Sequence, residues 1–136
     1  MKKLLLISVI LISVIACKKT EFSPEGPTDV RIRNLSDVIF NEVTVDISDT
    51  IGNYGSISPQ AVSDYIRFEK AYPKAMISVK VDIGGSMVTF STGTVDYTYM
   101  QFIGQDRITY EVYISSMDKK ELKIDNVVIE EPLILK

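Results

Sequence analysis

The chain has 136 residues with a formal net charge of −3, one cysteine and no histidine. This mildly acidic balance, without a basic stripe, does not fit the electrostatic footprint by which proteins bind nucleic acids, so nucleic acid is not an expected partner. A single cysteine rules out a disulfide within the chain, and the absence of histidine removes imidazole as a general base and as a metal ligand.

The N-terminal segment has the organisation of an export signal. A basic start at residues 2–3 is followed by an uncharged apolar run over residues 4–16 and then by Cys17. At about 1.5 Å per residue this run makes a helix of roughly 20 Å, which is shorter than the roughly 30 Å hydrocarbon core of a membrane. We therefore predict a cleaved signal peptide over residues 1–16, with an uncleaved anchor, favoured by the lysines at residues 18–19, as the alternative.

The end of this segment, Val14-Ile15-Ala16-Cys17, resembles the lipobox of bacterial lipoproteins, in which apolar and small residues precede a cysteine. In that family a diacylglyceryl group is attached to the cysteine sulfur, a dedicated peptidase cleaves before the cysteine, and the new amino group is usually acylated. The resemblance implies cleavage between Ala16 and Cys17 and fatty-acid chains such as palmitate on Cys17. Two or three such chains would hold a protein on a membrane essentially permanently.

The residue after the cysteine bears on localisation. In the family's sorting rule for cells with two membranes, an aspartate at this position retains the lipoprotein on the inner membrane. Lys18 stands there. The resemblance therefore implies the outer membrane, and it leaves open which leaflet the protein faces. The whole chain also resembles, in its style, the small lipoproteins abundant in Bacteroidota.

The remaining chain divides into a tether and one domain. Cleavage would remove two lysines with the signal and leave 120 residues with a formal charge of −5. Residues 17–28 contain two prolines and a glycine and no apolar period, so we predict a lipidated N-terminus and a flexible tether. The rest is long enough for a single core, and we predict one domain over residues 29–136.

Alternating apolar and polar residues, the pattern of strands with one buried face, dominate this domain. Gly84-Gly85 predicts a tight hairpin turn with a return strand over residues 86–90. In the last alternating run the parity of the apolar residues changes, so we predict a bulge or break near Asp125-Asn126. Pro132 disfavours a central strand at the end of the chain. The alternating runs cover residues 30–33, 43–47, 77–83, 108–114 and 122–129.

The segment from Pro59 to Tyr72 fits two interpretations. Ser58 could cap a helix with Pro59 at its first position. Residues 65–68 are β-forming and favour a strand instead, which is the interpretation we prefer. Seven or eight short strands without a long helix then predict an all-β domain. We expect an antiparallel β-sandwich of immunoglobulin-like or transthyretin-like type.

Candidate catalytic chemistry is limited to carboxylates. Nothing in the spacing marks two of them as convergent, so we predict no catalytic residue and no cofactor. Asp46 and Asp49 lack the acid-rich loop of a calcium site, so no metal site is predicted either. The carboxylates considered are Asp46, Asp49, Asp64, Glu130 and Glu131.

An aromatic segment is the candidate binding surface. Residues 97–103 are apolar on both parities, so they are either deeply buried or an interface. Tyrosine is common on protein-binding surfaces but is also an ordinary strand residue. We take Tyr97, Tyr99 and Phe102 as the candidate binding face, with a role in the core as the alternative.

One further motif concerns modification. Asp49-Thr50-Ile51 resembles the three-residue O-glycosylation signal of proteins exported by Bacteroidota, which implies a sugar on Thr50. Asn34-Leu35-Ser36 matches the eukaryotic N-glycosylation pattern, but a bacterial lipoprotein would not normally be modified there.

Two function hypotheses follow. The leading one is a membrane-anchored lipoprotein of the cell envelope, held by lipid on Cys17, that acts as a non-enzymatic binding or assembly module for an envelope protein or glycan. The alternative is a histidine-free enzyme that acts on an envelope glycan through carboxylates. A cleft holding two acids favours the enzyme, whereas an exposed aromatic or apolar patch favours the binding module. A structural or inhibitor domain predicts neither feature.

Overall fold

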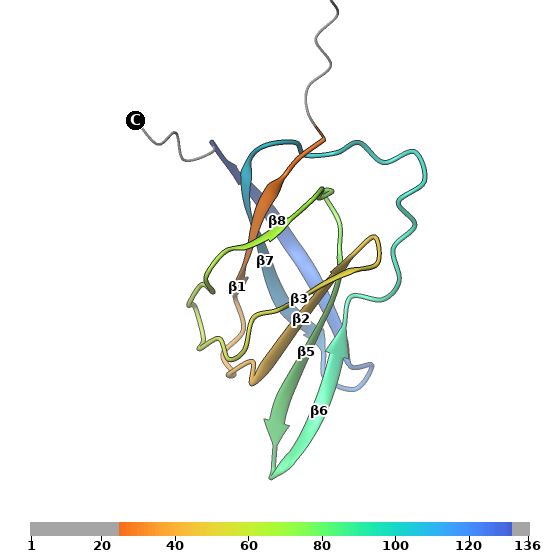
Figure 1. Ribbon diagram of the computed structural model, residues 1–136. Coiled ribbons are helices and arrows are strands. Elements are labelled where there is room, and N and C mark those ends of the chain that lie inside the picture. Colours follow the sequence, from red (N-terminus) through yellow and green to blue (C-terminus); the bar gives the residue numbers. More distant parts are fainter. Residues whose placement is uncertain (1–24, 132–136) are drawn as a thin grey trace, which may run out of the picture.

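A computed structural model describes residues 25–131, which form eight strands and no helix (Figure 1). The predicted all-β class is therefore confirmed. This part of the chain holds no helix that could cross a membrane. The predicted signal peptide, the lipidation site at Cys17 and Pro132 lie outside the described residues. The strands are β1 (Thr28–Asn34), β2 (Glu42–Ile47), β3 (Thr50–Asn53), β4 (Ile66–Phe68), β5 (Met76–Ile83), β6 (Ser86–Ser91), β7 (Arg107–Ser116) and β8 (Glu121–Glu130).

All eight strands belong to one mixed sheet with the order β3-β2-β5-β6-β8-β7-β1-β4. Two of its pairs are parallel, β1 with β7 and β6 with β8. The expectation of a purely antiparallel arrangement was wrong at these pairs, because alternation identifies a strand without identifying its neighbour in space. The immunoglobulin-like or transthyretin-like sandwich is not confirmed, since a single sheet curls until it nearly closes on itself.

The two outer strands of the sheet, β3 and β4, are in contact where the Phe68 side chain of β4 packs on Gly52 of β3. Gly52 of β3 is buried, and a Cβ atom placed on it would lie 2.8 Å from Cζ of Phe68 in β4. Just after β3, the Tyr54 hydroxyl donates a hydrogen bond to the Val30 carbonyl oxygen of β1 at 2.7 Å. Gly52 thus leaves the space that the Phe68 ring fills. This contact and the Tyr54 hydrogen bond hold the β3 edge of the curled sheet against β4 and β1.

The core lies inside this curl. The apolar parity of the predicted strands is largely buried, as with Val43, Val45 and Ile47 of β2, whereas Ile83 and Ile129 at the strand ends are exposed. Tyr110 of β7 is also fully buried, and its hydroxyl donates a hydrogen bond to the Tyr72 carbonyl oxygen. Burial of apolar area at about 25 cal/mol per Å² is the main stabilising term for such a core.

The two detailed local predictions are confirmed. Gly84 and Gly85 both have positive φ and join β5 to β6, with Ile83 paired to Ser86. In the β7 and β8 ladder, the partner of β7 jumps from Asn126 to Ile124, so Asp125 is the extra residue of a bulge. The bulge lets Val127 pack against the core together with Leu122 and Ile124, whereas Ile129, which the parity change also predicts on the core side, is 59% exposed.

No helix forms between Pro59 and Tyr72, so the interpretation as a strand is confirmed for residues 66–68. The backbone groups of this segment form hydrogen bonds and strand pairs with β1 instead of helical hydrogen bonds. Ser63 N–H donates to the Ile32 carbonyl at 2.8 Å, and Thr28 of β1 pairs with Phe68 of β4. Pairing with β1 therefore outweighs the local helix start signal at Ser58.

Candidate functional site

The weakest connection in the sheet is the one between β6 and β8. It consists of one paired position, Ser91 with Glu121, and a backbone hydrogen bond from Ser91 N–H to the Lys120 carbonyl at 3.2 Å. Residues 92–106, which connect β6 to β7, pass along this side of the molecule (Figure 1). A groove of about 690 Å³ lies here. We call it the seam groove.

The seam groove has one wall from β8 and another from loops. Residues 121–127 of β8 line it, as do residues 73–75 before β5 and part of the loop at residues 92–106. Its apolar lining includes half-buried Met100, Ile124 and Val127. A volume of this size is within the range of about 300–1,000 Å³ that ligand sites occupy.

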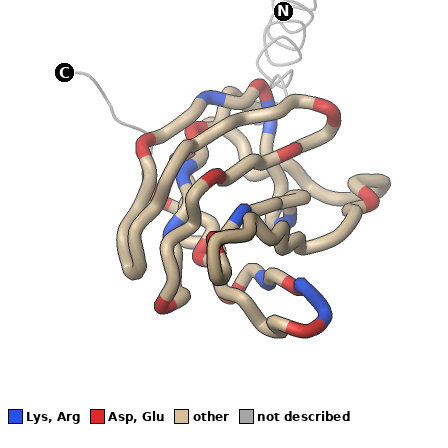
Figure 2. Tube along the Cα trace, turned by 90° about the horizontal axis from the view of Figure 1, so that it is seen from below, with Lys and Arg blue, Asp and Glu red and all other residues tan. Residues whose placement is uncertain are grey.

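Charged groups of both signs line the groove. They are the carboxylates of Asp96, Glu121 and Asp125 and the ammonium groups of Lys74 and Lys123. The Lys123 ammonium lies 3.5 Å from a carboxylate oxygen of Glu121. Figure 2 shows residues of both signs interspersed along the described chain. The groove therefore offers hydrogen-bonding groups and apolar area without a strong field of one sign.

Asp96 orders the loop beside the groove. The Thr98 backbone N–H donates to its Oδ1 at 2.9 Å, and hydrogen bonds from Thr98 hold the pKa of the Asp96 carboxyl below its usual range. The Met100 N–H then donates to the Tyr97 carbonyl at 3.0 Å and closes a turn. A general acid would need a raised pKa, so Asp96 is suited to fixing the turn rather than to donating a proton.

The structure divides the three predicted aromatic residues. The ring of Tyr97 packs on Tyr72 with centroids 4.6 Å apart, and its hydroxyl donates to the Asp46 carbonyl at 3.1 Å. Phe102 also packs on Tyr72, at 5.2 Å, yet it stays 38% exposed. Tyr99 is fully exposed. Tyr97 and Phe102 thus attach the loop to the core, and Tyr99 projects from it.

Tyr99 also has an unusual backbone conformation. Its φ is +65°, in the left-handed region that a bulky residue rarely adopts. The conformation costs about 1–2 kcal/mol and is fixed by the turn around it. An exposed aromatic ring held in a strained turn makes Tyr99 the candidate contact residue of this loop. We call residues 96–102 the aromatic turn.

The carboxylates considered from the sequence do not converge. Asp46 and Asp49 line a smaller hollow of about 250 Å³, and Asp46 Oδ1 accepts the Asp49 N–H at 3.1 Å within the turn after β2. Asp64 is exposed and lies just before β4, in a different part of the sequence. Within residues 25–131, no three side chains of the metal-ligating types could hold an ion together.

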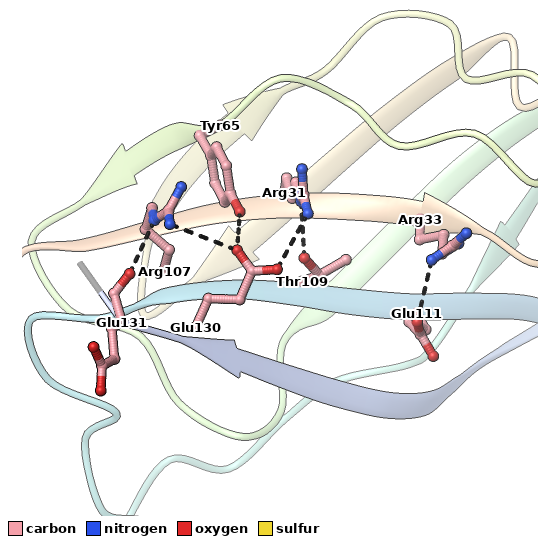
Figure 3. Close-up of polar contacts among 8 residues, drawn as sticks. All are labelled: Arg31, Arg33, Tyr65, Arg107, Thr109, Glu111, Glu130 and Glu131. Carbon is pink, nitrogen blue, oxygen red and sulfur yellow. Dashed lines mark hydrogen bonds and ion pairs between the residues drawn. The ribbon is translucent and has the colours of Figure 1, made fainter. Parts of the chain in front are cut away.

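Glu130 belongs to a polar cluster that the sequence did not predict. Its carboxylate accepts the Tyr65 hydroxyl at 3.0 Å and lies 3.5 Å from Arg31 and 3.8 Å from Arg107 (Figure 3). The guanidinium carbons of Arg31 and Arg107 lie 4.7 and 5.5 Å from the centre of the Tyr65 ring. Arg107 Nε also donates to the Glu131 carbonyl at 3.1 Å.

This cluster holds the segment before β4 against β1, β7 and β8. Its charges are turned toward one another, as Figure 3 shows, so the arrangement serves the sheet rather than a ligand. Cross-strand pairs of this kind are the usual means by which a sheet stabilises its solvent face. Tyr65 and Glu130 lie far apart in sequence, and no local spacing signals their contact.

The two glycosylation motifs differ in accessibility. Thr50 is exposed at the start of the edge strand β3, directly after Ser48 and Asp49, which have positive φ. Asn34 is fully buried, and its amide nitrogen donates to the carbonyls of Val38 and Ile57 at 2.7 and 3.1 Å. An exposed threonine meets the steric requirement for a sugar, whereas a buried amide with both protons engaged does not.

In comparisons with known proteins, neither a family model nor a curated protein matches this chain. Its function is therefore inferred from the seam groove, from the aromatic turn beside it and from the lipobox-like start of the sequence.

Proposed function

We propose that this chain is a lipid-anchored binding or assembly module of the cell envelope that acts without catalysis. The observation that carries the proposal is the aromatic turn, where Tyr99 is fully exposed next to a groove of about 690 Å³. Aromatic side chains are enriched where proteins bind other molecules, because they bury a large area at little entropic cost.

The aromatic turn is already ordered before any partner binds. Tyr97 fixes it to Tyr72 and to the backbone of β2, and Asp96 closes its first residues through Thr98. A surface held in one conformation loses little freedom on association, which favours affinity. Phe102 of the same turn is 38% exposed, with Lys70 Nζ 5.3 Å from its ring centre. This supports a docking role more than a role in folding.

The start of the sequence supports attachment to the outer membrane. Lipid on Cys17 would fix the chain to the membrane, and a predicted tether of 11 residues after it would place the domain roughly 18 Å from the anchor. Mass spectrometry of protein from its native host should find the chain beginning at a modified Cys17. A C17S variant should leave the membrane fraction, and its retention there would contradict the anchor.

The binding role is tested by crosslinking the lipidated chain in intact envelopes. Tyr99→Ala should lose the crosslinked partner. Ile51→Ala removes an exposed apolar side chain of β3 instead and is the matched control, because Ile51 is 62% exposed and lies outside the groove lining. Equal crosslinking by Tyr99→Ala and the control would overturn the proposal.

A second candidate function, a histidine-free enzyme on an envelope glycan, is favoured by one observation. Asp96, Glu121 and Asp125 bring three carboxylates to the lining of the seam groove. Carboxylate pairs hydrolyse glycosidic bonds when one of them is kept protonated. Release of reducing ends from purified envelope polysaccharide, abolished in D125N or E121Q, would support the enzyme and contradict the binding module.

We also propose that the sheet works as two packed layers. Because β6 and β8 share a single paired position, the strands β3-β2-β5-β6 and β8-β7-β1-β4 form two four-stranded halves with the core between them. In Figure 1 β2, β3, β5 and β6 lie in front of β7 and β8. This division supports a sandwich of immunoglobulin-like or transthyretin-like type as the finer fold class.

A further inference from the structure

β8 lies edge-on to the seam groove. Seven consecutive residues, 121–127, line the groove. Successive side chains of a strand point to opposite faces of a sheet, so a groove over one face would be lined by alternate residues only. An unbroken run of lining residues means that the groove follows the backbone edge of β8.

That edge has unused hydrogen-bonding groups. On one side β8 pairs with β7 along most of its length. On the other side, within the described residues, its paired position is Glu121 opposite Ser91. Every second N–H and C=O of a strand points away from a given neighbour. From residue 122 onward the outward groups of β8 therefore face the groove without a partner strand.

We propose that an extended polypeptide segment of an envelope partner adds to the edge of β8 as a further strand within the seam groove. The proposal rests on the binding function argued above and names its ligand class. A strand carries N–H and C=O groups at the spacing that the β8 edge presents, which a glycan does not. The free edge over residues 122–127, at about 3.3 Å per residue, accepts a peptide of six or seven residues.

The walls and charges of the groove select one strand rather than a whole sheet. Residues 73–75 and the loop at residues 92–106 form a wall opposite β8. If a second copy of this chain docked through its own β8, its β7 would lie alongside that strand and would clash with the wall. Lys123 is engaged by Glu121, which leaves Asp96 and Asp125 against Lys74 in the lining, and this excess of one carboxylate favours a peptide with a basic side chain.

The bulge at Asp125 and the charge of Lys123 are also devices that keep a free edge from pairing indiscriminately. A specific strand-binding edge needs the same protection against wrong partners. The two roles make different predictions: a protected edge binds no peptide, and a binding edge binds peptides through their backbone.

The test uses the full lipidated chain in detergent and an array of capped seven-residue peptides, in which apolar residues alternate with randomised ones. Bound peptides are resynthesised with N-methyl groups on alternate residues, in each of the two possible phases. Strand addition predicts that one phase loses affinity by about tenfold or more and the other phase does not, because only alternate N–H groups face β8.

Charge gives the second readout. D125K should weaken lysine-bearing peptides and strengthen glutamate-bearing ones. D118K is the matched control, since Asp118 is exposed in the turn before β8 and does not line the groove. A D118K effect equal to that of D125K would overturn the proposal, because the response would then reflect net charge rather than the groove.

The remaining outcomes separate this proposal from the function on which it rests. If no peptide binds, or if both methylated phases bind alike, strand addition is wrong. If purified envelope oligosaccharides bind through Tyr99 in the same experiment, the binding module stands with a glycan as its ligand. If Tyr99→Ala also leaves crosslinking in envelopes unchanged, the binding module falls as well.

Discussion

The two sides of β8 differ sharply in how they are used. Along one side, the ladder with β7 runs from Glu121 to Glu130 and continues through β7 to a parallel ladder with β1. Along the other side a single position joins β8 to β6. One strand thus belongs both to the most continuous part of the sheet and to its least continuous part.

Two tyrosines illustrate the difference between the continuous side of β8 and the seam. Tyr110, on the continuous side, is fully buried with its hydroxyl bonded to the Tyr72 carbonyl. Tyr99, beside the seam, is fully exposed in a strained turn. Regions that bind are usually those whose packing contributes least to folding. Substitutions on the two sides should therefore have effects of different kinds.

The largest effect is expected at Tyr110. Tyr110→Ala should lower the free energy of unfolding by about 3–5 kcal/mol, because it leaves a large cavity in the core. Tyr110→Phe keeps the ring and loses only the hydrogen bond to Tyr72, which should cost about 1–2 kcal/mol. Urea unfolding followed by circular dichroism measures both. A Tyr110→Ala variant within about 1 kcal/mol of the wild type would show that this side does not hold the molecule together.

A smaller effect is expected where the sheet closes. Gly52→Ala would place a Cβ 2.8 Å from Cζ of the buried Phe68 ring, so the ring or the edge strand must shift. We expect a loss of about 1–3 kcal/mol in the same unfolding experiment. Thr50→Ala, in the exposed first position of β3, is the control and should change little. An unchanged Gly52→Ala would mean that β3 does not pack tightly on β4.

The pair formed by Asp29 and Arg67 should add a pH dependence to the β1 and β4 side. Arg67 donates to both carboxylate oxygens of Asp29, at 2.8 and 3.1 Å, and these bonds hold the pKa of Asp29 below its usual range. A lowered folded-state pKa contributes stability above the unfolded value of about 3.9, and this stability is lost as the pH falls through the folded value.

Stability measured against pH tests this pair. The difference between the wild type and D29N should be small at neutral pH, because Arg67 is exposed, should begin to shrink below about pH 4, and should vanish only when the pH is below the lowered folded-state pKa of Asp29. A difference that grows on acidification would reverse the assigned direction. D118N, in an exposed turn, is the control and should show no such trend.

The sequence predicts local features of the sheet better than pairings between distant segments. Alternation over residues 77–83, with Gly84-Gly85 after it, sets the β5 and β6 hairpin, and the parity change near Asp125 sets the bulge. These are local consequences of side-chain direction. The parallel pair of β1 with β7 joins distant segments, and no local pattern encodes it.

The aromatic turn escaped prediction for a different reason. Tyr97 and Tyr99 share a parity, so in a strand both would face the same side. The chain turns there instead, held by Asp96 and Thr98, and one ring goes inward while the other goes outward. An aspartate side chain often accepts the backbone N–H two residues further on and so favours a turn. Asp96 was therefore the feature that could have indicated that Tyr97 and Tyr99 point in different directions. The binding role of these aromatics remains a prediction.

The smallest effect on folding is expected at Tyr99. Tyr99→Ala removes a ring that is fully exposed, so unfolding should change by no more than about 0.5 kcal/mol. Tyr97→Ala loses its packing on Tyr72 and its bond to the Asp46 carbonyl, and it should be clearly less stable. Capture of the envelope partner should fall in Tyr99→Ala even though its unfolding curve matches the wild type. A Tyr99→Ala variant that unfolds as readily as Tyr97→Ala would instead place the ring among the groups that fold the domain, and the seam would then differ from the continuous side only in its hydrogen bonding.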